Sequence, residues 1–147
     1  SDIAIPEGHY AEENMKSTVV PNRNTIMLSI AWSYACAIEA TYLGCGAHAG
    51  DHYIYPDCRP LYFSAFHEAL RLGTEGCGGE NLTFFLPFIR FDKSVIVRRG
   101  NQLGVPFEKT WTCYNGLEKH CGKCGSCTER KEAFKNAGLI DPVEYAE

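Results

Sequence analysis

The chain has 147 residues, which is enough for one domain of ordinary size with a buried core and too few for two full domains. Apolar residues make up 45% of the sequence and charged residues 22%, a globular composition that excludes intrinsic disorder. A formal net charge of -4 without a basic run argues against a nucleic acid partner, and the lack of a long apolar stretch or signal peptide favours a soluble, cytoplasmic protein away from membranes.

The first third of the chain is expected to hold one helix after an irregular start. Residues 1–23, with the acidic pair Glu12-Glu13, show little periodicity and predict a loop or a short helix. From Thr25 onward apolar residues recur on nearly every side, which predicts a buried helix over residues 25–39. Such a helix needs cover on two faces, so we expect its own sheet on one side and a missing N-terminal part or a second copy of the chain on the other.

The middle of the chain alternates between strand and helix patterns. Residues 41–48 predict a strand that leads into a polar loop at its carboxyl end, the place where α/β proteins usually bind ligands. Pro60 suits the first turn of a second helix, which should stop at the glycine-rich residues 73–79. These glycines lack the Lys-Ser or Lys-Thr of a phosphate loop, so a flexible connection is expected there.

The second half continues the alternation. An apolar run over residues 82–89 predicts a buried strand, and Asp92 is expected to cap a helix that extends to about residue 103. A final helix is predicted over residues 128–137, ended by Gly138. Helices and strands in this order predict an α/β fold with a parallel sheet.

Eight cysteines would suit a disulfide framework in a small secreted protein, but their distribution argues against one. Four of them lie within fifteen residues, and the other four are scattered through apolar or glycine-rich segments. The clustered residues are Cys113, Cys121, Cys124 and Cys127, and the scattered ones are Cys36, Cys45, Cys58 and Cys77. This pattern predicts a metal cluster together with ordinary thiols in a reducing compartment.

The clustered cysteines have the spacing C-x7-C-x2-C-x2-C, which is typical of zinc because two-residue spacers let neighbouring thiolates reach one ion. Four thiolates would fill the tetrahedron and leave no position for a catalytic water, so the zinc is expected to be structural. Gly122 and Gly125 would ease the tight turns. A redox-active Cys-x-x-Cys pair and an iron-sulfur cluster are the alternatives, and His120 is expected to be a neighbour rather than a ligand.

The polar loops carry further candidates, each with a plain structural alternative. His48, Asp51 and His52 would suit a metal or acid-base site, or would simply be solvated loop residues. Asp57 and Arg59 would form a salt bridge, or Arg59 would clamp a carboxylate through two parallel hydrogen bonds.

Two further groups of side chains have plain interpretations. Cys58 is expected to be a packed thiol, since it would act as a nucleophile only with a histidine nearby. Charged residues flank the predicted helix after Asp92, and most such charges are solvated; they are Arg90, Lys93, Arg98 and Arg99.

Four segments of the chain closely resemble the 7-cyano-7-deazaguanine synthase family, whose members make the queuosine precursor preQ0. They are residues 18–24 (TVVPNRN), 48–51 (HAGD), 55–60 (YPDCRP) and 111–131, which includes the clustered cysteines. The combination is far more specific than any one of these segments, and the resemblance covers nearly the whole chain.

The resemblance implies a fold, an activity and a metal. The fold would be the adenine-nucleotide α-hydrolase type, a Rossmann-like parallel sheet between helices. The reaction would convert 7-carboxy-7-deazaguanine and ammonia into the nitrile, by way of an activated carboxylate and an amide, with ATP and Mg²⁺ as co-substrate. A structural zinc would be bound by Cys113, Cys121, Cys124 and Cys127, one ion per chain.

One feature of the family has no match in this sequence. Family members begin with a strand and a Ser-Gly-Gly-x-Asp-Ser loop that binds pyrophosphate, and the chain contains no such string. The chain is therefore expected to be the second part of the enzyme and inactive alone. Residues 1–110 would form a partial domain that binds nucleotide and substrate, and residues 111–147 a zinc-binding segment with the last helix.

Within that resemblance, side-chain chemistry suggests roles for the polar loops. Asp57 would accept hydrogen bonds from the guanine-like ring edge, and Arg59 would pair with a carboxylate or phosphate. His48 and Asp51 would line the same pocket.

Other assignments complete this hypothesis. Arg23 and Lys93 are expected near nucleotide or substrate, and a homodimer is the first assembly to test. The alternatives are a non-catalytic zinc-bearing module, one half of a split enzyme, and a relative of the tRNA-modifying thiolases, which fits YPDCRP less well.

Overall fold

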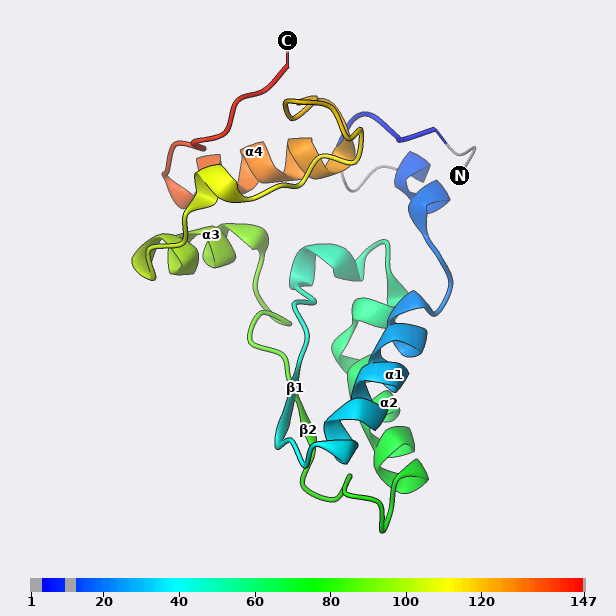
Figure 1. Cartoon of the computed structure of the whole chain (residues 1–147). Coiled ribbons are helices and arrows are strands. Elements are labelled where there is room, and N and C mark those ends of the chain that lie inside the picture. Colours follow the sequence, from blue (N-terminus) through cyan, green and yellow to red (C-terminus); the bar gives the residue numbers. More distant parts are fainter. Residues whose placement is uncertain (1–3, 10–12, 147) are drawn as a thin grey trace. The chain divides into compact units, whose positions relative to one another are not determined.

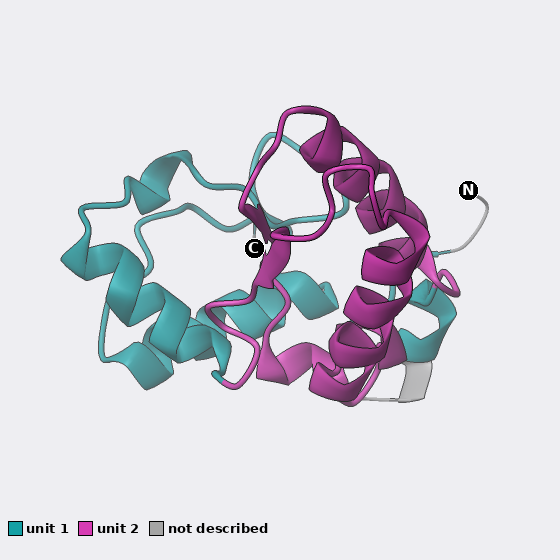
Figure 2. Cartoon of the chain, turned by 90° about the horizontal axis from the view of Figure 1, so that it is seen from below, with its two compact units in different colours: residues 1–19, 91–147 teal, residues 20–90 magenta. Residues whose placement is uncertain are grey.

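The computed structural model describes residues 4–9 and 13–146. The chain divides into two compact units (Figure 2): residues 1–19 with 91–147 form unit 1, and residues 20–90 form unit 2. The sequence expectations for residues 1–3, 10–12 and 147, Glu12 among them, lie outside the described residues. The predicted domain boundary between residues 110 and 111 stays a prediction.

Unit 2 has the predicted order of helix, strand, helix and strand (Figure 1). Its elements are α1 (Arg23–Ala37), β1 (Tyr42–Gly44), α2 (Pro60–Gly73) and β2 (Thr83–Phe85). The two strands pair in parallel, and α2 supplies the crossover connection that a parallel pair requires.

Both strands are shorter than predicted. After Gly44 the chain turns away into two 3₁₀ helices, η2 (Ala49–His52) and η3 (Pro56–Cys58). Beyond β2, Pro87 has no N–H to continue a ladder, and residues 87–90 form a turn. The apolar run over residues 82–89 is thus part strand and part turn.

The core of unit 2 lies on one face of the sheet. Leu43 and Phe84 face each other across the strand pair, and both pack against buried residues of the helices. Those residues are Leu28, Trp32, Ala35 and Cys36 of α1 and Phe63 of α2. On the opposite face of the sheet Tyr42 and Phe85 are exposed.

The expectation that the first helix is buried holds for one side only. Every fourth residue along the other side of α1 is apolar and exposed, and we call this the α1 stripe: Ile26, Ile30, Tyr34 and Ile38. The exposed fractions of Ile30 and Tyr34 are 69% and 68%. The sheet therefore covers one face of α1, while the described residues leave the other uncovered.

Unit 1 contains two helices that pack against each other, α3 (Lys93–Gln102) and α4 (Gly125–Ala137). As predicted, Asp92 caps α3: its Oδ1 accepts the backbone N–H groups of Ser94 at 2.9 Å and Val95 at 3.2 Å. Val97 of α3 is buried against Phe134 of α4.

The last helix ends where predicted and begins earlier. Gly138 terminates α4 in a left-handed conformation, with a φ of 72°. Helix α4 begins at Gly125, three residues before the predicted start, because Cys124 has the extended backbone of a residue that precedes a helix. Gly125 is therefore the first residue of a helix and does not form the tight turn expected of it.

Two further 3₁₀ helices complete unit 1. They are η1 (Glu13–Thr18), which agrees with the predicted short helix, and η4 (Phe107–Lys109). Among the described residues no helix has the length and apolar character to cross a bilayer.

Candidate metal centre and polar loop

The four clustered cysteines come together in unit 1. Cys113 and Cys121 lie in the loop before α4, Cys124 precedes the helix, and Cys127 lies in its first turn. One sulfur atom from each lies within 4.8 Å of the others. The Sγ atoms of Cys121 and Cys127 are 3.9 Å apart, close to the roughly 3.8 Å edge of a tetrahedron with Zn–S bonds of about 2.3 Å. The set therefore fits a metal ion such as zinc.

Backbone N–H groups point at these sulfur atoms. The amide of Cys121 donates to Cys113 Sγ at 3.3 Å, and the amides of Lys123 and Cys124 donate to Cys121 Sγ at 3.4 and 3.3 Å. Burial alone would raise the pKa of Cys121, but the amides of Cys124 and Lys123, together with the side chains of Asn115 and Cys113, lower it to about 6. Gly122 allows both donors to reach the sulfur because its φ of 74° is left-handed.

The same sulfur atoms need a compensating positive charge. Burial and the neighbouring thiol of Cys124 raise the pKa of Cys127 well above its ordinary value. Several thiolates in one buried cluster repel one another unless a cation lies between them. The donor chemistry thus agrees with the geometry: four soft, buried sulfur ligands suit a thiophilic divalent ion.

His120 lies beside this cluster and is not part of it. Its ring is 4.2 Å from the ring of Trp111 and 5.6 Å from that of Tyr145. The side chain is buried, and its Nδ1 has no hydrogen-bond partner among the described residues. Burial, followed by the nearby charge of Arg130, lowers its pKa. These contacts agree with the expectation of a neighbour.

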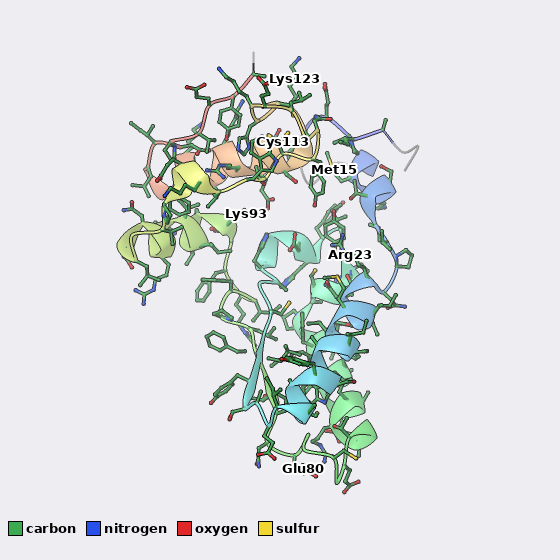
Figure 3. All side chains as sticks on the ribbon, in the orientation of Figure 1. Met15, Arg23, Glu80, Lys93, Cys113 and Lys123 are labelled. Atoms are coloured by element: carbon green, nitrogen blue, oxygen red, sulfur yellow. The ribbon has the colours of Figure 1, made fainter. Side chains whose placement is uncertain are left out.

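The N-terminal segment completes the metal loop, which the sequence did not suggest. Glu7 forms an antiparallel bridge with Cys124. The Gly8 N–H donates to the Lys123 carbonyl at 3.2 Å, and the Gly125 N–H donates to the Pro6 carbonyl at 3.3 Å. Figure 3 labels Lys123 and Cys113 on this loop. Residues 6–8 therefore form one edge of the candidate metal centre.

The structure brings His48 and Asp51 together on the loop after β1. His48 is 6% exposed, and its Nε2 lies 3.4 Å from Asp51 Oδ2. Its Nδ1 accepts the N–H of Gly50 at 3.2 Å, so the ring proton is on Nε2 and faces the carboxylate. His48 is therefore a buried, oriented residue and not a solvated one.

Asp57 lies at the N-terminus of α1. Its Oδ2 accepts the backbone N–H of Asn24 at 3.0 Å, and its carbonyl oxygen accepts the Asn24 side-chain amide at 3.0 Å. The hydroxyl groups of Thr25 and Tyr62 lie 2.9 Å apart beside this junction. Two segments that are distant in sequence, VVPNRN and YPDCRP, therefore meet at one end of β1.

Arg59 and Cys58 follow in the same segment. The Nε of exposed Arg59 donates to the His52 carbonyl at 2.8 Å, and its two terminal nitrogens have no hydrogen-bond partner in the described part of the chain. No ion pair joins Arg59 to Asp57 there. Burial, with the nearby charges of Asp51 and Asp57, raises the pKa of Cys58 to about 12, as expected of a packed thiol.

Arg23 and Lys93 are the first residues of α1 and α3, in different units. Arg23 is exposed. The Lys93 ammonium pairs with the carboxylate of Glu129 on α4, so its charge is already partly balanced. The roles of both residues stay predictions, as do those of His48, Asp51, Asp57 and Arg59.

A surface hollow of about 270 Å³ lies between α2 and β2. Its lining includes Phe63, Ser64, His67, Phe84 and Arg90, and none of the predicted site residues. The hollow is therefore separate from the side chains to which a role in the predicted site is assigned.

Comparisons with known proteins agree with the resemblance seen in the sequence. A family model described as queuosine biosynthesis protein QueC matches residues 1–138. A protein of Methanoregula boonei named 7-cyano-7-deazaguanine synthase is 53% identical over 145 residues, which cover 99% of this chain and 65% of the relative.

Two bacterial relatives carry the same name. The protein of Hahella chejuensis is 53% identical over 98% of this chain and 61% of its own length, and that of Agrobacterium fabrum is 49% identical over 98% and 60%. The chain thus spans about 60 to 65% of the length of these relatives.

Proposed function

The chain belongs to the family of the queuosine biosynthesis protein QueC, and on that premise we propose that it carries the substrate loop and the zinc segment of a 7-cyano-7-deazaguanine synthase. The reaction joins 7-carboxy-7-deazaguanine and ammonia, with ATP and Mg²⁺, and ends in the nitrile. About 35 to 40% of the relatives' length has no counterpart in residues 1–147, and the proposed reaction is that of the full-length relatives.

One observation carries this proposal: Asp57 and Arg59 lie one residue apart on the loop at the carboxyl end of β1. Arg59 is held at Nε by the His52 carbonyl, while its two terminal nitrogens have no hydrogen-bond partner among the described residues. A guanidinium fixed at one nitrogen and open at two presents the fork that pairs with a carboxylate. Asp57 supplies an acceptor for ring N–H groups beside it.

Each residue of the proposed site would have its own role in the reaction. Arg59 would hold the substrate carboxylate while it is activated, and would release it as its negative charge disappears. Asp57 would keep the deazapurine ring in place through both activation steps. His48 and Asp51 would line the same pocket, and Arg23 and Lys93 would contact the nucleotide phosphates or the substrate.

Zinc would be held by Cys113, Cys121, Cys124 and Cys127 and would have a structural role. Four thiolates complete its tetrahedron, so the ion would fix the loop before α4 to the helix. The eight cysteines are all free of disulfides, which supports a reducing, cytoplasmic location.

The α1 stripe supports an interface on this side of α1. Four large apolar residues in a row are the size of surface that usually marks an interface. Its occupant would be the part present in the longer relatives or, for this chain alone, a second copy in a two-fold dimer.

Titration calorimetry with 7-carboxy-7-deazaguanine tests the substrate loop. We expect Arg59→Ala to weaken binding by at least about tenfold, the effect of losing one charge-assisted contact. Arg99→Ala is the matched control, since Arg99 is exposed and, among the described residues, its side chain donates a hydrogen bond to Gln102 alone. Equal affinities of the Arg59 variant and the wild type would remove the assignment.

Complementation tests the function as a whole. The chain is mixed with the part of the Methanoregula boonei relative that lies outside the matching region, and mass spectrometry follows nitrile formation from 7-carboxy-7-deazaguanine, ammonia and ATP. Nitrile formation only in the mixture is the expected result for one half of a split enzyme. A stable complex without deazapurine binding would favour the alternative, a non-catalytic zinc-bearing module.

A further inference from the structure

We propose that Asn24 is a positioning residue of the substrate site, which holds Asp57 so that one carboxylate oxygen is left for the ring edge of the ligand. The inference rests on the proposed function, because it takes Asp57 as the residue that recognises the deazapurine ring. The inference gives the segment VVPNRN a role in substrate recognition, namely the positioning of Asp57.

Three hydrogen bonds join Asn24 to the YPDCRP segment. The backbone N–H of Asn24 donates to Asp57 Oδ2 at 3.0 Å. The side-chain amide donates to the Asp57 carbonyl at 3.0 Å and to Cys58 Sγ at 3.3 Å. One asparagine thus fixes both the backbone and the side chain of Asp57, from a position 33 residues earlier.

The local structure of α1 explains why the carboxylate is accepted there. The residue before the helix, Asn22, has a φ of 56° and makes no side-chain cap, so the first N–H groups of α1 need another acceptor. Asp57 fills that role from outside the helix. A carboxylate is also favoured at this end because the helix dipole is positive there.

The pairing leaves a defined recognition group. Asp57 Oδ2 is engaged by the helix, and Oδ1 has no partner among the described residues. Asp57 therefore presents one acceptor in a fixed direction, which suits a single N–H of a guanine-like ring. An adenine-like ring has no N1 proton and no 2-amino group to offer there, so the geometry predicts discrimination between the two rings.

A merely structural Asn24 would tie α1 to η3 and affect stability alone. The two roles differ in ligand preference, since a loss of folding stability lowers the affinity for all ligands together. The test therefore compares 7-carboxy-7-deazaguanine with 7-carboxy-7-deazaadenine, which carry the same carboxylate on different rings. The measured quantity is the ratio of their dissociation constants at a temperature where all variants are folded.

Four variants of the chain separate these contributions. Asn24→Asp keeps the side-chain shape and loses the two amide donors, while Asn24→Ala removes the side chain. Both variants keep the backbone N–H that donates to Asp57 Oδ2, so they test the side-chain contacts with the Asp57 carbonyl and Cys58 Sγ. Asn101→Asp makes the same change of charge on an exposed residue of α3 and serves as the control. Arg59→Ala should weaken both ligands by the same factor, because both carry the carboxylate.

We expect the wild type and the control to prefer the guanine-type ligand by about tenfold, the effect of one hydrogen bond to a charged group, and both Asn24 variants to lose that preference. A ratio unchanged in Asn24→Ala would overturn the positioning role while leaving the proposed function intact. If the wild type binds neither ligand, it is the proposed function that fails.

A ligand-free measurement keeps the inference testable in that case. The ¹³C signal of the Asp57 carboxyl group should shift in Asn24→Ala and stay in place in Asn101→Asp. An unshifted Asp57 signal would show that the Asn24 side chain does not position this carboxylate, whatever the chain binds.

Discussion

The guanidinium of Arg130 and the carboxylate of Asp141 form a two-bond ion pair inside unit 1. Nε lies 2.8 Å from Oδ2 and Nη2 lies 2.9 Å from Oδ1, and each side chain is 8% exposed. Arg130 also donates to the carbonyl groups of Thr110 and Phe107, and the Tyr145 hydroxyl donates to Asp141 at 2.6 Å. The network ties α4 to η4 and to the C-terminal segment.

Removing one partner of this pair should destabilise unit 1 strongly. Arg130→Ala leaves a buried carboxylate without compensation, and we expect a loss of about 3–5 kcal/mol in the free energy of unfolding. Urea denaturation followed by circular dichroism measures this change. The control is Arg71→Ala, whose partner Glu68 is exposed, so little change is expected. Similar effects of both substitutions would contradict the structural role of the network.

The same pair predicts part of the acid response. Burial opposes the charge of Asp141, but hydrogen bonds from Arg130 and Tyr145 hold its pKa below the ordinary value. A carboxyl group with a lowered pKa in the folded state stabilises the protein above the unfolded pKa of about 3.9, and this contribution is lost as the pH falls through the folded pKa. Stability measured from pH 6 to pH 2 should therefore fall less steeply in Asp141→Asn, although that variant is less stable at pH 6.

Acid also releases thiolate-bound metal, so the comparison needs a second pair of curves. Both proteins are measured again with excess zinc, which shifts the release of metal to lower pH. The difference between them in the acid range should stay at the same pH. A difference that moves with the zinc concentration would assign the acid response to the cysteines instead.

Metal removal should loosen both edges of the metal loop. Freshly purified protein is expected to contain one zinc ion per chain, and binding in small zinc modules contributes on the order of ten kcal/mol to folding. Chelation should therefore increase amide hydrogen exchange at Gly8 and Gly125 and unfold the C-terminal third. Residues of α2 in unit 2 should keep their protection. If the Gly8 and Gly125 amides stay protected in metal-free protein, the proposed coupling between metal binding and the structure of the metal loop is wrong.

The thiols of unit 2 should differ sharply in reactivity. Burial and two nearby carboxylates raise the pKa of Cys58 to about 12, so little of it is thiolate at pH 8. Cys77 is exposed in the glycine-rich connection. Brief treatment with iodoacetamide and peptide mapping should find Cys77 modified and Cys58 unmodified. Rapid modification of Cys58 in folded protein would reopen its role as a nucleophile.

The α1 stripe should drive association of the isolated chain. Ile30→Glu places a charge in its centre and should lower the mass measured by light scattering at micromolar concentration, with less binding of a dye for apolar surfaces. Ile140→Glu is the control, because Ile140 is an exposed apolar residue of unit 1 outside the stripe. A single-chain mass for the wild type, without dye binding, would mean that the stripe is covered in solution.

Local signals predicted the helices well. Pro60, Asp92 and Gly138 each mark a helix end through their own backbone or side-chain chemistry, and the structure confirms all three. The strands were predicted too long, because apolar character alone does not separate a strand from the turn that continues it after Phe85. Whether an apolar face of α1 is covered depends on polypeptide outside the helix, which periodicity does not report.

In the candidate site, too, one part could be predicted from local sequence signals and another part could not. The cysteine cluster could be predicted from the sequence, because its four residues lie at a characteristic spacing within one short segment. The contact between Asn24 and Asp57 joins residues 33 positions apart, and no short motif encodes such a pairing. The signal that was available was the presence of both VVPNRN and YPDCRP in one chain.

The antiparallel bridge between Glu7 and Cys124 joins opposite ends of the sequence, with all of unit 2 inserted between them. A synthetic peptide of residues 111–147 would therefore contain every cysteine and still leave the Gly125 N–H and the Lys123 carbonyl without their protein partners. A minimal peptide model of the metal centre has to include residues 4–9, either in the same peptide or in a second one. Truncation of residues 4–9 would therefore first destabilise the metal loop around Cys124, near the other end of the sequence.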